Sequence, residues 1–339
     1  MSKLFAAMFF ILLCASSSYA QVLQVPGKNE KIEFIGLKRQ QAQDVLDRLQ
    51  ALAPGKPLHA CAAELKGKLG FADAAVILHF DENKKFYTVV TLIEKEDAHR
   101  VQYLPELKSS NDAASLSWKD GLALTAQQHL LQAAVYSYGL VLNGKTDEAE
   151  KMAQDTFGVK TAEVKPIWEF LKKHQSKEDQ ALAIWTLQHH GDYHHRALAA
   201  LVLMNFADAD LSWWCLVEAL RDPHAVVNGT AHQVLTTLVK HRPRHVDWRP
   251  AVSSIRPILA GTNLFVFSGM LEILRNTSIA PDLSEAVLKG NTDLLTAYLQ
   301  ARHPDSRNKA VLFVKHLSGG GERTPEEWID WLKKYQEGH

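Results

Sequence analysis

One pattern recurs between Asp179 and Leu317 of this 339-residue chain. An acidic or small turn residue is followed by a cationic or amide residue, then by alanine, and then by leucines at helical spacing. The clearest copies begin at Gly191, Arg221 and His303. Units repeated every roughly 30 to 45 residues are typical of stacked helix pairs, because one pair alone cannot bury its apolar face. The pattern therefore predicts a helical array with a binding surface, and it does not identify the partner.

The stretch from Leu216 to Leu238 resembles a HEAT repeat of the short bacterial kind. In that family an aspartate-proline turn leads into the inner helix, which carries arginine and alanine three residues apart. Asp222-Pro223 matches the turn and Ala231 matches the alanine, whereas Asn228 stands where arginine is usual. The resemblance implies a right-handed α-solenoid of HEAT-like helix pairs and implies no particular activity.

Other copies of the repeat fit the family pattern to different degrees. The matching residues are Gly191-Asp192 with Arg196 and Ala199, and Asp305 with Arg307 and Ala310. A degenerate copy from Gly261 to Leu274 has Gly269 at the alanine position. A small residue there lets inner helices approach closely, and the aspartate is suited to cap the helix N-terminus.

The region before the repeats has mixed periodicity and predicts a small α+β domain. Two helices are expected at Lys38–Leu52 and Leu58–Leu69, after a short strand at Ile32–Ile35. The period then changes to two, which predicts a β-hairpin from Ala75–Phe80 and Phe86–Ile93. We also expect Arg100–Leu104 to add a third strand.

The chain divides into six predicted parts. They are a signal peptide (1–20), the α+β domain (21–107), a linker (108–120), a helical connector (121–177), HEAT-like repeats (178–318) and a C-terminal capping helix (319–339). The last helix has a strong start, because Thr324, Pro325 and Glu327 form a capping box with proline at the first helical position. We expect Trp328 and Trp331 on this helix to dock on the last repeat.

The first 20 residues predict export. Lys3 precedes an apolar run of 12 residues from Leu4 to Ala15, and Ser18-Tyr19-Ala20 ends the segment with small residues at the cleavage positions. A membrane anchor is the alternative, but 12 residues are too few to span about 30 Å of hydrocarbon. A lipoprotein signal at Cys14 is a second alternative. No later segment predicts a transmembrane helix, so we expect a periplasmic or extracellular protein.

Composition and motifs exclude several classes of function. Lys plus Arg and Asp plus Glu number 38 each, so the chain lacks the concentrated basic charge that nucleic-acid binding needs. It contains no GxSxG, Walker or GxGxxG motif, so we expect no enzymatic activity and no cofactor. We expect Cys61 and Cys215 to be buried and unpaired, although export makes a disulfide the alternative.

Two clusters carry alternative hypotheses. His189–His195 offers His190, Asp192 and His194 as metal ligands for a hydrolase. We favour a solvated turn between helices, because neighbouring side chains on a turn diverge. The segment Lys240–Arg256 carries five cations and one anion, which together with exposed tryptophans suits a carbohydrate- or envelope-binding module. A basic loop without a ligand is the favoured interpretation.

The sequence thus predicts an exported scaffold that binds another protein, of unknown identity, on its inner helices. The candidate partner-binding residues are Arg196, Asn228, Arg242, Arg244 and Arg307. For the three inner-helix positions among them, hydrogen bonding to neighbouring turns is the favoured alternative.

Overall fold

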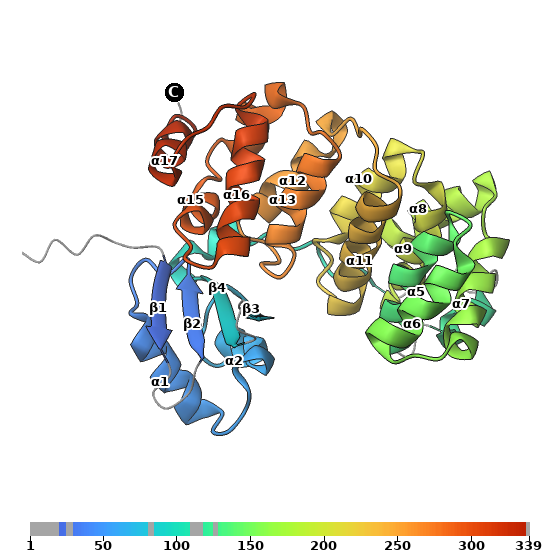
Figure 1. Ribbon diagram of the computed structural model, residues 1–339, viewed down its shortest axis with the longest axis horizontal. Helices are drawn as coiled ribbons and strands as arrows, with labels where there is room; N and C mark the ends of the chain where they lie inside the picture. The colour runs from blue at the N-terminus through green and yellow to red at the C-terminus, as the bar shows by residue number, and fades with distance from the viewer. Residues whose placement is uncertain (1–19, 25–29, 81–84, 109–117, 125–127, 337–339) are drawn as a thin grey trace, which may run out of the picture.

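The N-terminal part of the chain forms a four-stranded mixed sheet, and the remainder is mainly helical (Figure 1). The computed structural model describes residues 20–24, 30–80, 85–108, 118–124 and 128–336. The predicted signal peptide therefore lies outside the described residues except for Ala20, and most of the predicted linker does as well. None of the helices in these ranges is long and apolar enough to cross a membrane.

The strand order in the sheet is β1-β2-β4-β3. The strands are β1 (Ala20–Gln24), β2 (Lys31–Ile35), β3 (Asp73–Phe80) and β4 (Phe86–Ile93). The β2–β4 pair is parallel, and the other two pairs are antiparallel. The predicted hairpin is confirmed as β3 and β4. The prediction of a strand at Arg100–Leu104 is wrong, and the additional strand is β1, which pairs with β2 from Ala20 onward.

Both faces of the sheet are buried, and each face packs against a different part of the chain. One face, which carries Phe34, Val90 and Leu92, packs on α1 (Ala42–Leu52) and α2 (Ala62–Gly67). The opposite face, which carries Ile35 and Val89, belongs to the same hydrophobic core as the C-terminal helices. Burial on both sides explains why β4 is apolar at consecutive positions instead of alternating.

An extended segment at residues 101–108 follows the sheet and its short 3-10 helix η2 (Lys95–Arg100). The backbone N–H of Leu104 donates to the carbonyl of Arg221 at 2.8 Å, and the Arg221 side chain returns a bond to the carbonyl of Gln102 at 3.0 Å. The N–H of Gln102 also donates to Thr262. These residues fail to form a strand because their backbone groups bond to helix-connecting turns instead of to β-strands.

The remaining helices follow in sequence. The first group is α4 (Lys119–Leu124), α5 (Gln128–Val141), α6 (Thr146–Phe157) and α7 (Thr161–Lys173). The second group is α8 (Lys177–His189), α9 (Tyr193–Val202), α10 (Asp210–Ala219), α11 (Ala225–His241), α12 (Val252–Ala260), α13 (Phe267–Asn276), α14 (Ser284–Leu288), α15 (Asp293–Leu299), α16 (Pro304–Leu317) and α17 (Pro325–Lys333). Single 3-10 turns are η1 (Leu58–Ala60), η3 (Leu203–Phe206), η4 (Arg249–Ala251) and η5 (Pro281–Leu283).

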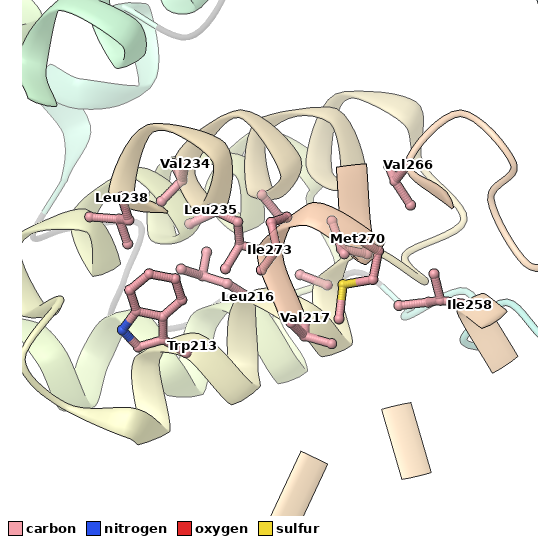
Figure 2. Packing of buried hydrophobic residues seen from close by; sticks show 14 of the residues in the cluster. Trp213, Leu216, Val217, Val234, Leu235, Leu238, Ile258, Val266, Met270 and Ile273 are labelled. Atoms are coloured by element: carbon pink, nitrogen blue, oxygen red, sulfur yellow. The ribbon is translucent and has the colours of Figure 1, made fainter. Parts of the chain in front are cut away.

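The second group of helices packs in two rows. In one row α8 contacts α10, α10 contacts α12, and α12 contacts α14 and α15. In the other row α9 contacts α11, α11 contacts α13, and α13 contacts α16. We call the second row the inner row, since it contains the helices that begin at the repeated turns. Figure 2 shows the core between the rows, where Trp213 and Leu216 of α10 meet Leu235 of α11 and Ile273 of α13.

Small residues let the inner helices approach closely. Ala199, Ala231 and Ala310, the three predicted repeat alanines, are fully buried. At the degenerate copy, a Cβ on Gly269 would lie 2.2 Å from Nε2 of His232 on α11. Glycine at that position therefore follows from helix packing.

The first group of helices covers part of the inner row. Contacts join α5 to α11 and α4 to α9.

At the other end, α17 packs on α15 and α16, with Trp328 buried. The predicted capping box is present, because Thr324 accepts from the N–H of Glu327 and Glu327 accepts from the N–H of Thr324. Cys61 and Cys215 are buried and unpaired, as expected.

Candidate binding cleft

A cleft of about 1000 Å³ lies between the sheet and the helical part. We call it the β3 cleft, because residues 73–76 of the edge strand β3 form one wall. The sheet side also contributes residues of η1 and α2, and the opposite side is formed by α5, the start of α11 and the turn before α13. Its lining is His59, Ala62, Lys66, Asp73, Ala74, Ala75, Val76, Tyr103, His129, Gln132, Pro223, Ala225, Asn228, Gly229, Gln233, Asn263, Leu264 and Phe265.

Asp73 ties the walls of the cleft together. Its buried carboxylate accepts from the backbone N–H of Leu264 at 3.1 Å and from the hydroxyl of Tyr103 at 3.1 Å. Burial, together with the Asp73 charge, raises the pKa of Tyr103 above its usual range, so the hydroxyl stays protonated and donates. Lys66 lies 3.5 Å from the same carboxylate. The sheet wall and the α13 turn are thus held in fixed relation.

The conformation of the turn that carries Phe265 is fixed by Asn263, through its backbone angle and a side-chain hydrogen bond. Asn263 has a positive φ of 57° and donates from its side chain to the carbonyl of Leu220 at 2.7 Å. Asparagine tolerates the left-handed region better than most residues. The turn presents Phe265 with 55% of its surface exposed, which is unusual for a large aromatic side chain. The ring therefore offers an apolar contact at the edge of the cleft.

The α11 wall is polar and open. Asn228 donates from Nδ2 to the carbonyl of Asp222 at 2.9 Å, which fixes its side chain at the helix start. Gly229 follows in the body of α11, and a Cβ placed there would have nothing within 4 Å. In the described part of the chain, the side chains of Gln132 and Gln233 make no hydrogen bond. These amides are therefore available to a ligand.

Among the predicted partner-binding residues, Asn228 alone lines this cleft. Arg196 is buried and donates to both carboxylate oxygens of Asp222, at 2.7 and 3.0 Å, and to the carbonyls of His190 and Gly191. Arg196 thus joins one helix pair to the next by bonding to neighbouring turns, which was the favoured alternative to partner binding. Arg307 lies half-buried on α16, away from the cleft lining.

The histidine run forms the turn between α8 and α9, as expected, but the prediction that it is solvated is wrong for His190 and His195. His190 and His195 are 2% and 8% exposed, and their rings stack with centroids 3.9 Å apart. Asp192 accepts the backbone N–H groups of His194 and His195 and caps α9. Within the described residues no group of three or more His, Cys, Asp or Glu side chains is placed to hold a metal ion. The metal hypothesis gains no support from this geometry.

Several cations of the basic segment Lys240–Arg256 pair with acids elsewhere in the chain. Arg242 lies 3.3 Å from Asp208, and Arg244 lies 2.6 Å from Asp210. Both partners lie outside the segment, Asp208 just before α10 and Asp210 at its first position. Trp328 is buried, whereas Trp331 is half-buried and packs against Trp328 and Tyr335.

Sequence reasoning missed most of the cleft. His129 and Gln132 lie on α5, Tyr103 on the extended segment and Phe265 on the turn before α13, and no motif joins these three places. The one available signal was Gly229, a glycine inside a helix that otherwise follows the repeat pattern. Comparison with family models, curated proteins and solved structures finds no match to this chain.

Proposed function

We propose that this protein binds a segment of another protein in the β3 cleft, with a HEAT-like α-solenoid as the supporting framework. The solenoid assignment is supported by the two rows of helices and by the residues at the turns. Arg196 and Asn228 occupy equivalent positions, since each donates to the carbonyl of the residue six positions earlier, His190 and Asp222 respectively. The same side-chain-to-carbonyl hydrogen bond thus recurs in two successive helix pairs.

The observation that carries the binding proposal is the cleft itself. An open strand edge, two amide side chains without hydrogen bonds in the described chain, and the exposed Phe265 ring converge on one cavity. Protein-binding sites combine apolar anchors with polar groups in this way. Asp73, the one carboxylate among the described lining residues, holds the walls of the cleft together.

Export of the protein remains part of the proposal. It is supported by the basic, apolar and small-residue order of the first 20 residues. Cleavage after Ala20 would leave Gln21–Gln24 to pair with β2, so most of β1 would survive in the mature chain.

The test is affinity capture from the cell envelope with three forms of the protein. The wild type and Gly229→Ala leave the cleft open, whereas Gly229→Trp places an indole in it. Since nothing lies within 4 Å of the position, both variants should fold. A partner retained by the first two proteins and lost with Gly229→Trp supports the proposal. Equal capture by all three would place any binding outside the cleft.

A further inference from the structure

We propose that the occupant of the β3 cleft is an extended, carboxylate-bearing segment of the partner, which adds as a fifth strand to the free edge of β3. This inference rests on the proposed binding function and specifies its ligand class. In strand addition, main-chain hydrogen bonds provide affinity, and contacts to alternate side chains provide specificity.

The cleft meets the edge of β3 and not one of its faces. Asp73, Ala74, Ala75 and Val76 are consecutive, and all four line it. Successive side chains in a strand point to opposite faces, so a surface lined by consecutive residues must include the backbone edge. β3 is the last strand in the order of the described sheet and pairs on its other side with β4. Asp73, Ala74 and Ala75 are buried, and the N–H of Ala74 already donates to Oδ1 of Asp73 at 2.9 Å, so the accessible part of this edge begins at Val76.

The charges of the cleft favour an acidic occupant. Lys66 keeps 46% of its side chain exposed, and His59 and His129 are exposed on opposite walls. The cleft also receives the N-terminal end of the 17-residue helix α11, which carries partial positive charge. Among the described lining residues Asp73 is the one carboxylate; it is buried, it accepts from Tyr103 and Leu264, and it lies 3.5 Å from Lys66, whose side chain stays partly exposed. A carboxylate on the ligand would complement these groups.

Gly229 supplies the room that a strand needs. A glycine inside a helix costs about 0.5–1 kcal/mol relative to alanine. Packing explains the two other glycines in helices of this region, since a Cβ at Gly139 or Gly269 would meet a neighbouring side chain at 2.6 or 2.2 Å. No such contact exists at Gly229. Its lack of a side chain keeps the cleft wide opposite the edge of β3, where Gln132 and Gln233 can bond to a ligand backbone.

The experiment selects random linear peptides from a display library on the purified full-length protein. We expect the selected peptides to be enriched in Asp and Glu over the starting library. Their affinity should fall as salt rises, and Gly229→Glu should weaken binding about tenfold or more through like-charge repulsion. Gly229→Lys should bind at least as tightly as Gly229→Ala, the matched control.

Hydrogen exchange of the peptide complex locates the contact. Amides of β3 should exchange several-fold more slowly with peptide bound, while those of β1, the other edge strand, should not change. Peptides that bind without protecting β3, or without a preference for acidic residues, overturn strand addition and leave the cleft function standing. If no peptide is selected, strand addition is also overturned, and the capture experiment alone decides whether a folded partner uses the cleft.

Discussion

The carboxylate of Glu33, on β2, accepts the backbone N–H of His303, which lies 270 positions further along the chain, at 2.9 Å. It also accepts from the backbone N–H of Arg302 and from the hydroxyl of Tyr87. Glu33 is fully buried, so a strand from the N-terminal part supplies acceptors to the turn that starts α16. The sheet is thereby anchored to the helical part, and the position of the β3 cleft between them is fixed.

Replacement of Glu33 should destabilise the whole protein. Glu33→Gln keeps the shape but puts an amide where two backbone N–H groups need acceptors, so we expect a loss of about 1–3 kcal/mol in the free energy of unfolding. Chemical denaturation measures this loss, with Glu106→Gln at an exposed position as the control. Equal stabilities of the two variants would show that Glu33 does not anchor the sheet.

The Arg196–Asp222 pair should matter more than any arginine of the basic segment. Arg196→Ala leaves a buried carboxylate without its partner, and breaking a buried pair costs about 3–5 kcal/mol. Arg242→Ala removes an exposed pair and should cost no more than about 1 kcal/mol. Denaturant unfolding of the two variants gives the comparison. A similar small effect of both would mean that Arg196 does not connect the helix pairs.

Two glycines of the inner row should respond oppositely to alanine. Gly229→Ala should raise stability by about 0.5–1 kcal/mol, because alanine is the better helix former and the new methyl meets nothing. Gly269→Ala should lower stability by about 1–3 kcal/mol, because its Cβ would press on the His232 ring. Thermal unfolding of both variants tests the assignment. A stabilising effect at position 269 would show that the helices are not so closely packed.

His232 should make the protein less stable in acid. Burial lowers the pKa of His232 to about 4, against about 6.5 for an unperturbed histidine. The unfolded chain therefore binds a proton first, so stability is complete above about pH 6.5 and is lost progressively as the pH falls toward 4. Burial also lowers the pKa of His79 and of His303, whose rings lie 4.1 Å apart, and this adds to the loss.

The measurement is unfolding at a series of pH values for wild type and His232→Leu, with the exposed His99→Leu as the control. The His232 variant should show a shallower decline in stability between pH 6.5 and 4, and the control should follow wild type. A decline of the same slope in all three would mean that His232 does not titrate in this range.

Local features of the fold were predictable because local sequence determines them. The helix predicted at Lys38–Leu52 and found at Ala42–Leu52, the β3–β4 hairpin and the Thr324 cap each follow from periodicity or capping residues within a few positions. The strand β1 was missed because Ala20–Gln24 is short and falls at the end of the predicted signal peptide. The acid in the middle of β2, Glu33, indicated a buried polar contact, but its partners lie in the turn before α16, far along the chain.

The candidate site was largely unpredictable for a related reason. Helical periodicity indicates which face of a helix is buried, and it does not indicate which surfaces of separate elements meet. Asn228 was named from the repeat pattern, whereas Gln132 and Phe265 have no distinguishing sequence context. Arg242 and Arg244 looked free because their acidic partners, Asp208 and Asp210, lie outside the segment that was counted.

Site-specific photocrosslinking tests whether the β3 cleft binds another protein. A photoreactive amino acid replaces Gln132 in the β3 cleft or, as a control, the exposed Leu211 on α10 in the other row of helices. The protein is then irradiated in its native cells. We expect a discrete protein adduct from position 132 that is absent from position 211 and abolished by Gly229→Trp. Adducts of equal yield from both positions, or none from position 132, would contradict a binding function for the cleft.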